Sequence, residues 1–165
     1  MLTHYRKPVS LSVISTDLPI RSFIETAATV YQKDRARFHL LLHEPDIIEA
    51  KLQPLSALQP QFIRPTRQKP RLLWLEVSPD RAVMTMQGNG QFSYRHLWQK
   101  GVYGISRYYL QTESQPLPNQ IRLRNFTRTF QLMGQLWPEQ LRLEYELWCE
   151  NLQLGCYVLN LEVHH

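Results

Sequence analysis

A two-residue alternation of apolar and polar side chains in the C-terminal half most constrains what this chain can fold into. It is clearest near the C-terminus, over Leu141, Arg142, Leu143, Glu144, Tyr145, Glu146 and Leu147. Successive side chains of a β-strand point to opposite faces of a sheet, so the alternation predicts a strand with one buried and one solvated face.

Further segments of this kind precede and follow it, and short stretches rich in glycine, proline, serine or asparagine separate several of them. The sequence predicts strands over residues 72–77, 82–87, 91–98, 102–112, 121–132, 141–150 and 154–163. Strands joined in chain order by short turns form an antiparallel meander.

The N-terminal part differs in its periodicity. Residues 9–14 are short and β-branched and predict a strand, whereas residues 19–34 predict a helix capped by Asp17, with Pro19 in its first turn. Its apolar residues recur at helical spacing: Ile20, Phe23, Ile24, Ala27, Val30 and Tyr31. A strand over 37–43 and a short helix over 45–52 follow. The predicted fold class is α+β: a curved antiparallel meander or partly closed barrel of seven or eight strands, with one main N-terminal helix packed on it.

At 165 residues the chain is predicted to form a single domain over 1–165, containing an exposed loop at 53–70 interrupted by four prolines. It shows neither a signal peptide nor eighteen consecutive apolar residues. We therefore expect no membrane span. The two cysteines, Cys149 and Cys156, are too few for a disulfide framework, so we expect a cytoplasmic protein.

Charge is distributed unevenly along the chain. Residues 61–138 contain eleven lysines and arginines against three acids, whereas residues 139–165 contain one arginine against five acids. Fourteen of the nineteen basic residues are arginine, which favours bidentate contacts with carboxylate or phosphate groups.

The predicted strand over 121–132 carries the clearest candidate site. Alternation places arginines and an aromatic ring on one of its faces, and two arginines on neighbouring strands extend the basic patch. The candidate ligand-binding residues are Arg95, Arg107, Arg122, Arg124, Phe126 and Arg128.

Two interpretations of these arginines remain open. A turn near Gln135 would pair residues whose numbers add to about 270–272, which sets Arg128 beside Glu144 or Arg142 and Arg122 opposite Glu150 in a ladder of ion pairs. Alternatively, the arginines face a ligand. A β-bulge at Asn125 would re-aim the strand and favour the ion-pair ladder.

Chemistry-bearing motifs are scarce. His39 and His43 are four residues apart on a predicted strand, which does not suit a metal site, and no nucleophile stands in a glycine-flanked turn. The sequence therefore predicts no metal and no cofactor, and favours a protein that is not an enzyme.

The favoured hypothesis is a binding or assembly protein that engages an acidic protein surface through the arginine and aromatic sheet face. The proline-rich loop would contribute Arg64, Arg67, Lys69 and Arg71. The opposite charges of the two segments also suit homo-oligomerisation. The alternatives are a lipocalin-like carrier or chaperone for an anionic amphipathic molecule, such as a tetrapyrrole or fatty acid, and, less favoured, single-stranded nucleic-acid binding.

Overall fold

Ten β-strands make up the regular structure of the described chain. The computed structural model describes residues 4–43, 72–87, 92–110 and 119–165. The strands are β1 (His4–Ser15), β2 (Arg21–Gln32), β3 (Phe38–His43), β4 (Leu72–Val77), β5 (Arg81–Gln87), β6 (Phe92–Gln99), β7 (Tyr103–Leu110), β8 (Asn119–Met133), β9 (Gln140–Cys149) and β10 (Leu152–Val163).

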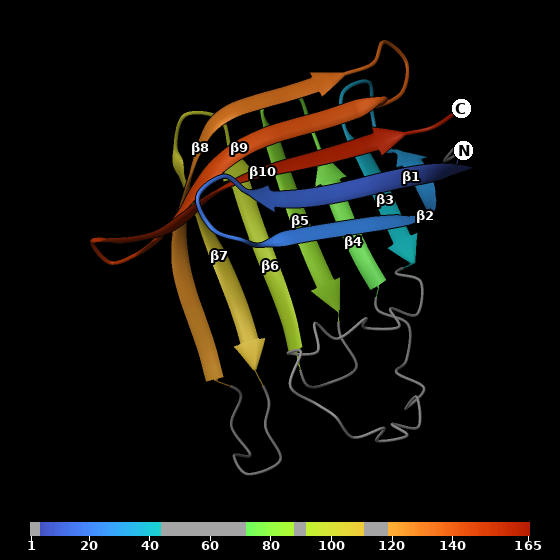
Figure 1. The fold of residues 1–165 in the computed structure, drawn as a ribbon. Coiled ribbons are helices and arrows are strands. Elements are labelled where there is room, and N and C mark those ends of the chain that lie inside the picture. The colour runs from blue at the N-terminus through green and yellow to red at the C-terminus, as the bar shows by residue number, and fades with distance from the viewer. Residues whose placement is uncertain (1–3, 44–71, 88–91, 111–118) are drawn as a thin grey trace, which may run out of the picture.

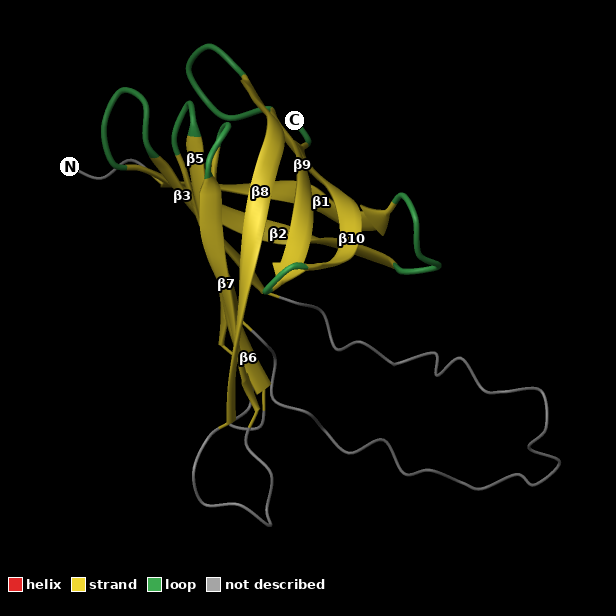
Figure 2. Cartoon of the chain, turned by 90° about the vertical axis from the view of Figure 1, so that its left-hand side faces the viewer, coloured by secondary structure: helices red, strands yellow, loops and turns green. Residues whose placement is uncertain are grey.

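The strands close into a barrel. Each strand pairs antiparallel with the next along the chain, and β1 pairs with both β2 and β10, so that no edge is left unpaired. In Figure 1, β1, β2, β9 and β10 cross in front of β3–β7 at a steep angle, and the two walls are also visible in Figure 2. Strand β8 joins the walls, because its first part pairs with β7 and its second part with β9.

Alternate residues of every strand fill the interior of the barrel. Val30, Leu40, Leu75 and Leu143 are each at most 2% exposed, and Trp98 is fully buried among them. The core is therefore an apolar layer between the two walls, built by the two-residue period rather than by a helix laid on a sheet.

The predicted α+β class and its N-terminal helix are wrong. Residues 21–32 form β2, whose inward side chains Ala28 and Val30 are buried while Phe23 is 62% exposed. The described residues contain ten strands and no helix, against the expected seven or eight strands. Threonine and other β-branched side chains favour a strand here, and pairing on both sides of β2 outweighs the helical spacing of its apolar residues.

The predicted strands from residue 72 onward correspond to β4–β10, and those over 9–14 and 37–43 lie within β1 and largely within β3. In the first part of the β8–β9 pairing the register is the one expected from the sequence, since Arg124 pairs with Trp148 and Thr127 with Tyr145. The numbers in both pairs add to 272.

Strand β8 contains a β-bulge, but not at Asn125, the position considered from the sequence. The register shifts between Thr127 and Thr129, and Asn125 is a fully buried, inward-facing residue. The irregularity switches the parity of the strand, so that Leu123 before it and Phe130 after it both face the interior.

Three features expected from sequence lie outside the described residues: the short helix at 45–52, the loop at 53–70 and the basic residues Arg64, Arg67, Lys69 and Arg71. Within the described ranges, the structure offers no helix that could cross a bilayer.

Candidate functional site

Three arginines form a line across the outer face of the barrel. Arg95 on β6 is the register partner of Arg107 on β7, and Arg107 is the partner of Arg122 on β8. Their sequence neighbours His96 and Ser106 point inward and are buried, so the three guanidinium groups belong to the outer surface. We call Arg95, Arg107 and Arg122 the arginine row.

No acid of the described residues neutralises the arginine row. Among the described residues, none of its members forms an ion pair, and the buried Nε of Arg107 has no hydrogen-bond partner. Like charges directly opposite each other across a sheet destabilise it. The row therefore costs folding free energy, and an ion-pair ladder does not explain it.

Arg124 extends the row with aromatic surface. Its guanidinium carbon lies 5.1 Å from the centre of the Tyr103 ring, and its Nη2 donates to the backbone oxygen of Glu150 at 2.6 Å. Tyr103 also contacts Phe126, with ring centroids 5.0 Å apart. Arg124, Tyr103 and Phe126 therefore lie together on the outer face.

Arg128 has a different environment. It lies at the bulge and forms an ion pair with Glu146, rather than standing beside Glu144 or Arg142 as expected. Trp148 donates its indole N–H to the same carboxylate at 2.8 Å, and Glu146 is only 7% exposed. A carboxylate with this burial and these partners fixes the bulge, so Arg128 is assigned a structural role.

Removing this carboxylate is expected to destabilise the barrel. Glu146→Ala leaves Arg128 and the indole of Trp148 without their acceptor, which should lower the free energy of unfolding by about 1–3 kcal/mol. Glu144→Ala is the matched control: Glu144 and Arg142 form an ion pair between side chains that are 39% and 44% exposed, so the loss should stay below about 1 kcal/mol. Urea unfolding measures the free energy of unfolding of both variants. Equal decreases in the two variants would contradict the structural role of Glu146.

A polar cluster inside the barrel was not predicted. Ser106 Oγ lies 2.7 Å from His96 Nδ1 and accepts a hydrogen bond from Asn125 Nδ2 at 2.8 Å. Burial lowers the pKa of His96 to about 4, so the imidazole is neutral at pH 7. His96 also stacks on Trp98, with centroids 4.9 Å apart. The alternation of Tyr94, His96 and Trp98 on one predicted strand was the signal available in the sequence.

Tyrosine side chains adjoin this cluster. Burial raises the pKa of Tyr108 to about 12, with a smaller contribution from Tyr157. Burial, and then the nearby hydroxyls of Tyr108, Tyr157 and Tyr94, raise the pKa of Tyr145. These phenols are therefore neutral, so the polar part of the core formed by these residues carries no net charge.

The described part of the chain brings no three metal-ligating side chains together. Cys149 pairs with Leu152 and Cys156 with Glu146, so the two thiols, both free, do not face each other across their hairpin. A shallow pocket lies on the outer face of β3–β5 and contains none of the candidate arginines.

Comparisons with known proteins inform the fold. No family model matches the chain, and no curated protein matches it. The chain is similar to the crystal structure of the ywiB protein from Bacillus subtilis, with a TM-score of 0.59 and 12% sequence identity over 99% of this chain and 96% of that one. At this identity, the likeness shows a shared fold.

Proposed function

We propose that this protein is a non-enzymatic binding protein that docks on an acidic protein surface through the arginine row. The observation that supports this most is the register of Arg95, Arg107 and Arg122 across three strands without an acidic partner among the described residues. Carboxylate groups of a partner protein that pair with these guanidinium groups in the interface, shielded from water, would relieve the repulsion within the arginine row.

The geometry of the row favours a protein partner. Neighbouring strands lie about 4.8 Å apart, so the row spans roughly 10 Å between its outer members. Carboxylates on one face of a helix or strand have comparable spacing, and each guanidinium can bind a carboxylate through two parallel hydrogen bonds. Because the arginines stand on paired strands, little backbone ordering is needed on binding.

The basic loop residues proposed to add to this surface are Arg64, Arg67, Lys69 and Arg71. The described strand ends that flank this segment, His43 of β3 and Leu72 of β4, lie at the same end of the sheet as Gln87 of β5 and Leu110 of β7. Arg95 and Arg122 are nearer to this end of their strands than to the other. We therefore include these four residues in the proposed interface.

The carrier alternative is less well supported by the site. An anionic amphipathic ligand held in a barrel needs its carboxylates to meet arginines at the interior, whereas this row stands on the outer face. Nucleic acid remains the competing partner for an outer basic surface, and a binding experiment with both kinds of polyanion distinguishes it from an acidic protein.

The test compares two probes and two variants. Isothermal titration with poly-L-glutamate and with oligothymidylate is carried out on the wild type, on Arg95→Gln/Arg107→Gln/Arg122→Gln, and on the matched control Arg6→Gln/Arg21→Gln/Arg35→Gln, which removes the same charge from other exposed positions. We expect the row variant to bind poly-L-glutamate at least about tenfold more weakly, and the control to stay within about threefold of the wild type.

Two results would contradict the proposal. Equal losses of affinity for poly-L-glutamate in the row variant and the control variant would mean that net charge alone attracts the polyanion. Tighter binding of oligothymidylate, with affinity falling steeply with salt, would assign the row to nucleic acid instead.

A further inference from the structure

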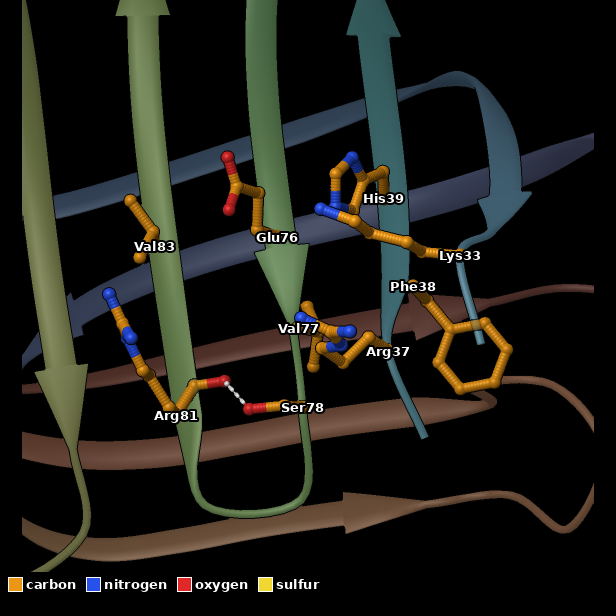
Figure 3. A pocket seen from close by; sticks show the side chains of 9 residues that line it. All are labelled: Lys33, Arg37, Phe38, His39, Glu76, Val77, Ser78, Arg81 and Val83. Atoms are coloured by element: carbon orange, nitrogen blue, oxygen red, sulfur yellow. Dashed lines mark hydrogen bonds between the residues drawn. The ribbon is translucent and has the colours of Figure 1, made fainter. Parts of the chain in front are cut away.

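The pocket on the outer face of β3–β5 is a second place where charged side chains gather. It has a volume of about 120 Å³ and lies where β4 turns into β5 (Figure 3). A volume of this size holds several water molecules, so the pocket has room for a carboxylate or phosphate group.

Three cationic side chains line this pocket. Lys33 and Arg37 come from the turn between β2 and β3, and Arg81 is the first residue of β5. In Figure 3, Arg81 stands on one side of the pocket, while Lys33 and Arg37 stand on the other. Lys33 and Arg81 form no ion pair with any described residue. Their charges are therefore available to a ligand.

The two turns that carry the guanidinium groups are held by hydrogen bonds. Asp34 accepts from the backbone N–H groups of Ala36 and Arg37, each at 3.0 Å, and from the Nε of Arg37. This leaves the two terminal nitrogens of Arg37 for other partners. On the opposite side, the Ser78 backbone N–H and hydroxyl donate to the backbone oxygen of Arg81 at 2.8 and 3.1 Å.

The floor of the pocket is apolar. Val83 is outward-facing, because its neighbours Ala82 and Met84 fill the interior, yet it is only 3% exposed. Val83 thus gives the pocket an apolar floor, while the side chains of Lys33, Arg37 and Arg81 are exposed to solvent.

Glu76 and His39 also line the pocket, and the Glu76 carboxylate restricts which ligands fit. They are register partners on β4 and β3, and Glu76 pairs with Val83 on its other side. The Glu76 carboxylate repels a second negative group but accepts a hydrogen bond from an amino or hydroxyl group next to the oxyanion.

We propose that this pocket binds the oxyanion group, carboxylate or phosphate, of a small ligand between Arg81 and the Lys33–Arg37 side, with Glu76 receiving a donor group of the same molecule. The residues differ from those of the arginine row, so the two proposals stand or fall separately.

The test follows backbone amide chemical shifts during titration with sodium phosphate, sodium acetate and O-phosphoserine at pH 7. We expect saturable shifts at the amides of Ser78, Arg81 and Val83, with O-phosphoserine binding more tightly than phosphate because its amino group reaches Glu76. Arg81→Gln and, independently, Lys33→Gln should weaken binding at least about fivefold, and Arg142→Gln, an exposed arginine on β9, should leave it unchanged.

Tighter binding of acetate than of phosphate would identify a carboxylate as the ligand group, and the reverse a phosphate. The proposal is overturned if no saturable shift occurs at these amides, or if Arg81→Gln and Lys33→Gln both bind as the wild type does. The triple variant of the arginine row should retain the full response, which separates failure of this site from failure of the proposed function.

Discussion

Replacing Gly104 by alanine is expected to destabilise the barrel by about 3 kcal/mol or more, the largest loss among the substitutions considered. A Cβ at this position would overlap the backbone carbonyl oxygen of Leu97 and approach Asn125 Oδ1 to 2.8 Å. Neither neighbour can yield cheaply, because one is backbone and the other is a fully buried side chain bonded to Ser106. Urea unfolding followed by tryptophan fluorescence measures the loss, and failure to fold would be its extreme form.

Gly101 is the matched control, since it lies in the turn before the same strand. Its φ of +73° disfavours a side chain, but a Cβ there would meet no atom within 4 Å. Gly101→Ala should therefore cost only the backbone strain, about 1–2 kcal/mol. A loss at Gly104 no greater than that at Gly101 would show that the close approach of β7 to β6 is not required for stability.

The two-residue period predicts most of the barrel because it reports directly which side chains are buried. Local spacing is misleading at β2, where Phe23 and Tyr31 fall on an apparent helical face with Val30. In the folded chain the first two point outward and only Val30 is buried. The decisive information was non-local: β1 and β3 supply pairing partners on both sides of this segment, and local spacing carries no trace of them.

The sequence identifies candidate arginines but does not determine how they lie relative to one another. Alternation places Arg95, Arg107 and Arg122 on outer faces, but only the register across the hairpins shows that they are direct partners. Arg128 shares its parity with Arg122 and Arg124 on β8, but at the bulge it forms an ion pair with Glu146. A bulge adds one residue without changing composition, so the sequence could suggest one but misplaced it.

Acid is expected to weaken the barrel through His96. Burial lowers the pKa of this imidazole from 6.5 to about 4, so the unfolded chain binds the proton more tightly than the folded protein does. The stability linked to neutral His96 is therefore fully present above pH 6.5 and is lost progressively as pH falls toward 4. Between pH 7.5 and 4.5 the loss should be about 2–3 kcal/mol, measured by urea unfolding at the two pH values.

A His96→Gln variant isolates this contribution from that of the carboxylates, which titrate in both proteins. Glutamine can still hydrogen-bond to Ser106 but takes up no proton, so the variant should lose about 2–3 kcal/mol less than the wild type between the two pH values. Equal losses would mean that His96 does not titrate with unfolding in this range. Because Ser106 also bonds Asn125, whose side chain packs beside Gly104, acid and the Gly104 substitution should disturb the same part of the core, where β6, β7 and β8 meet.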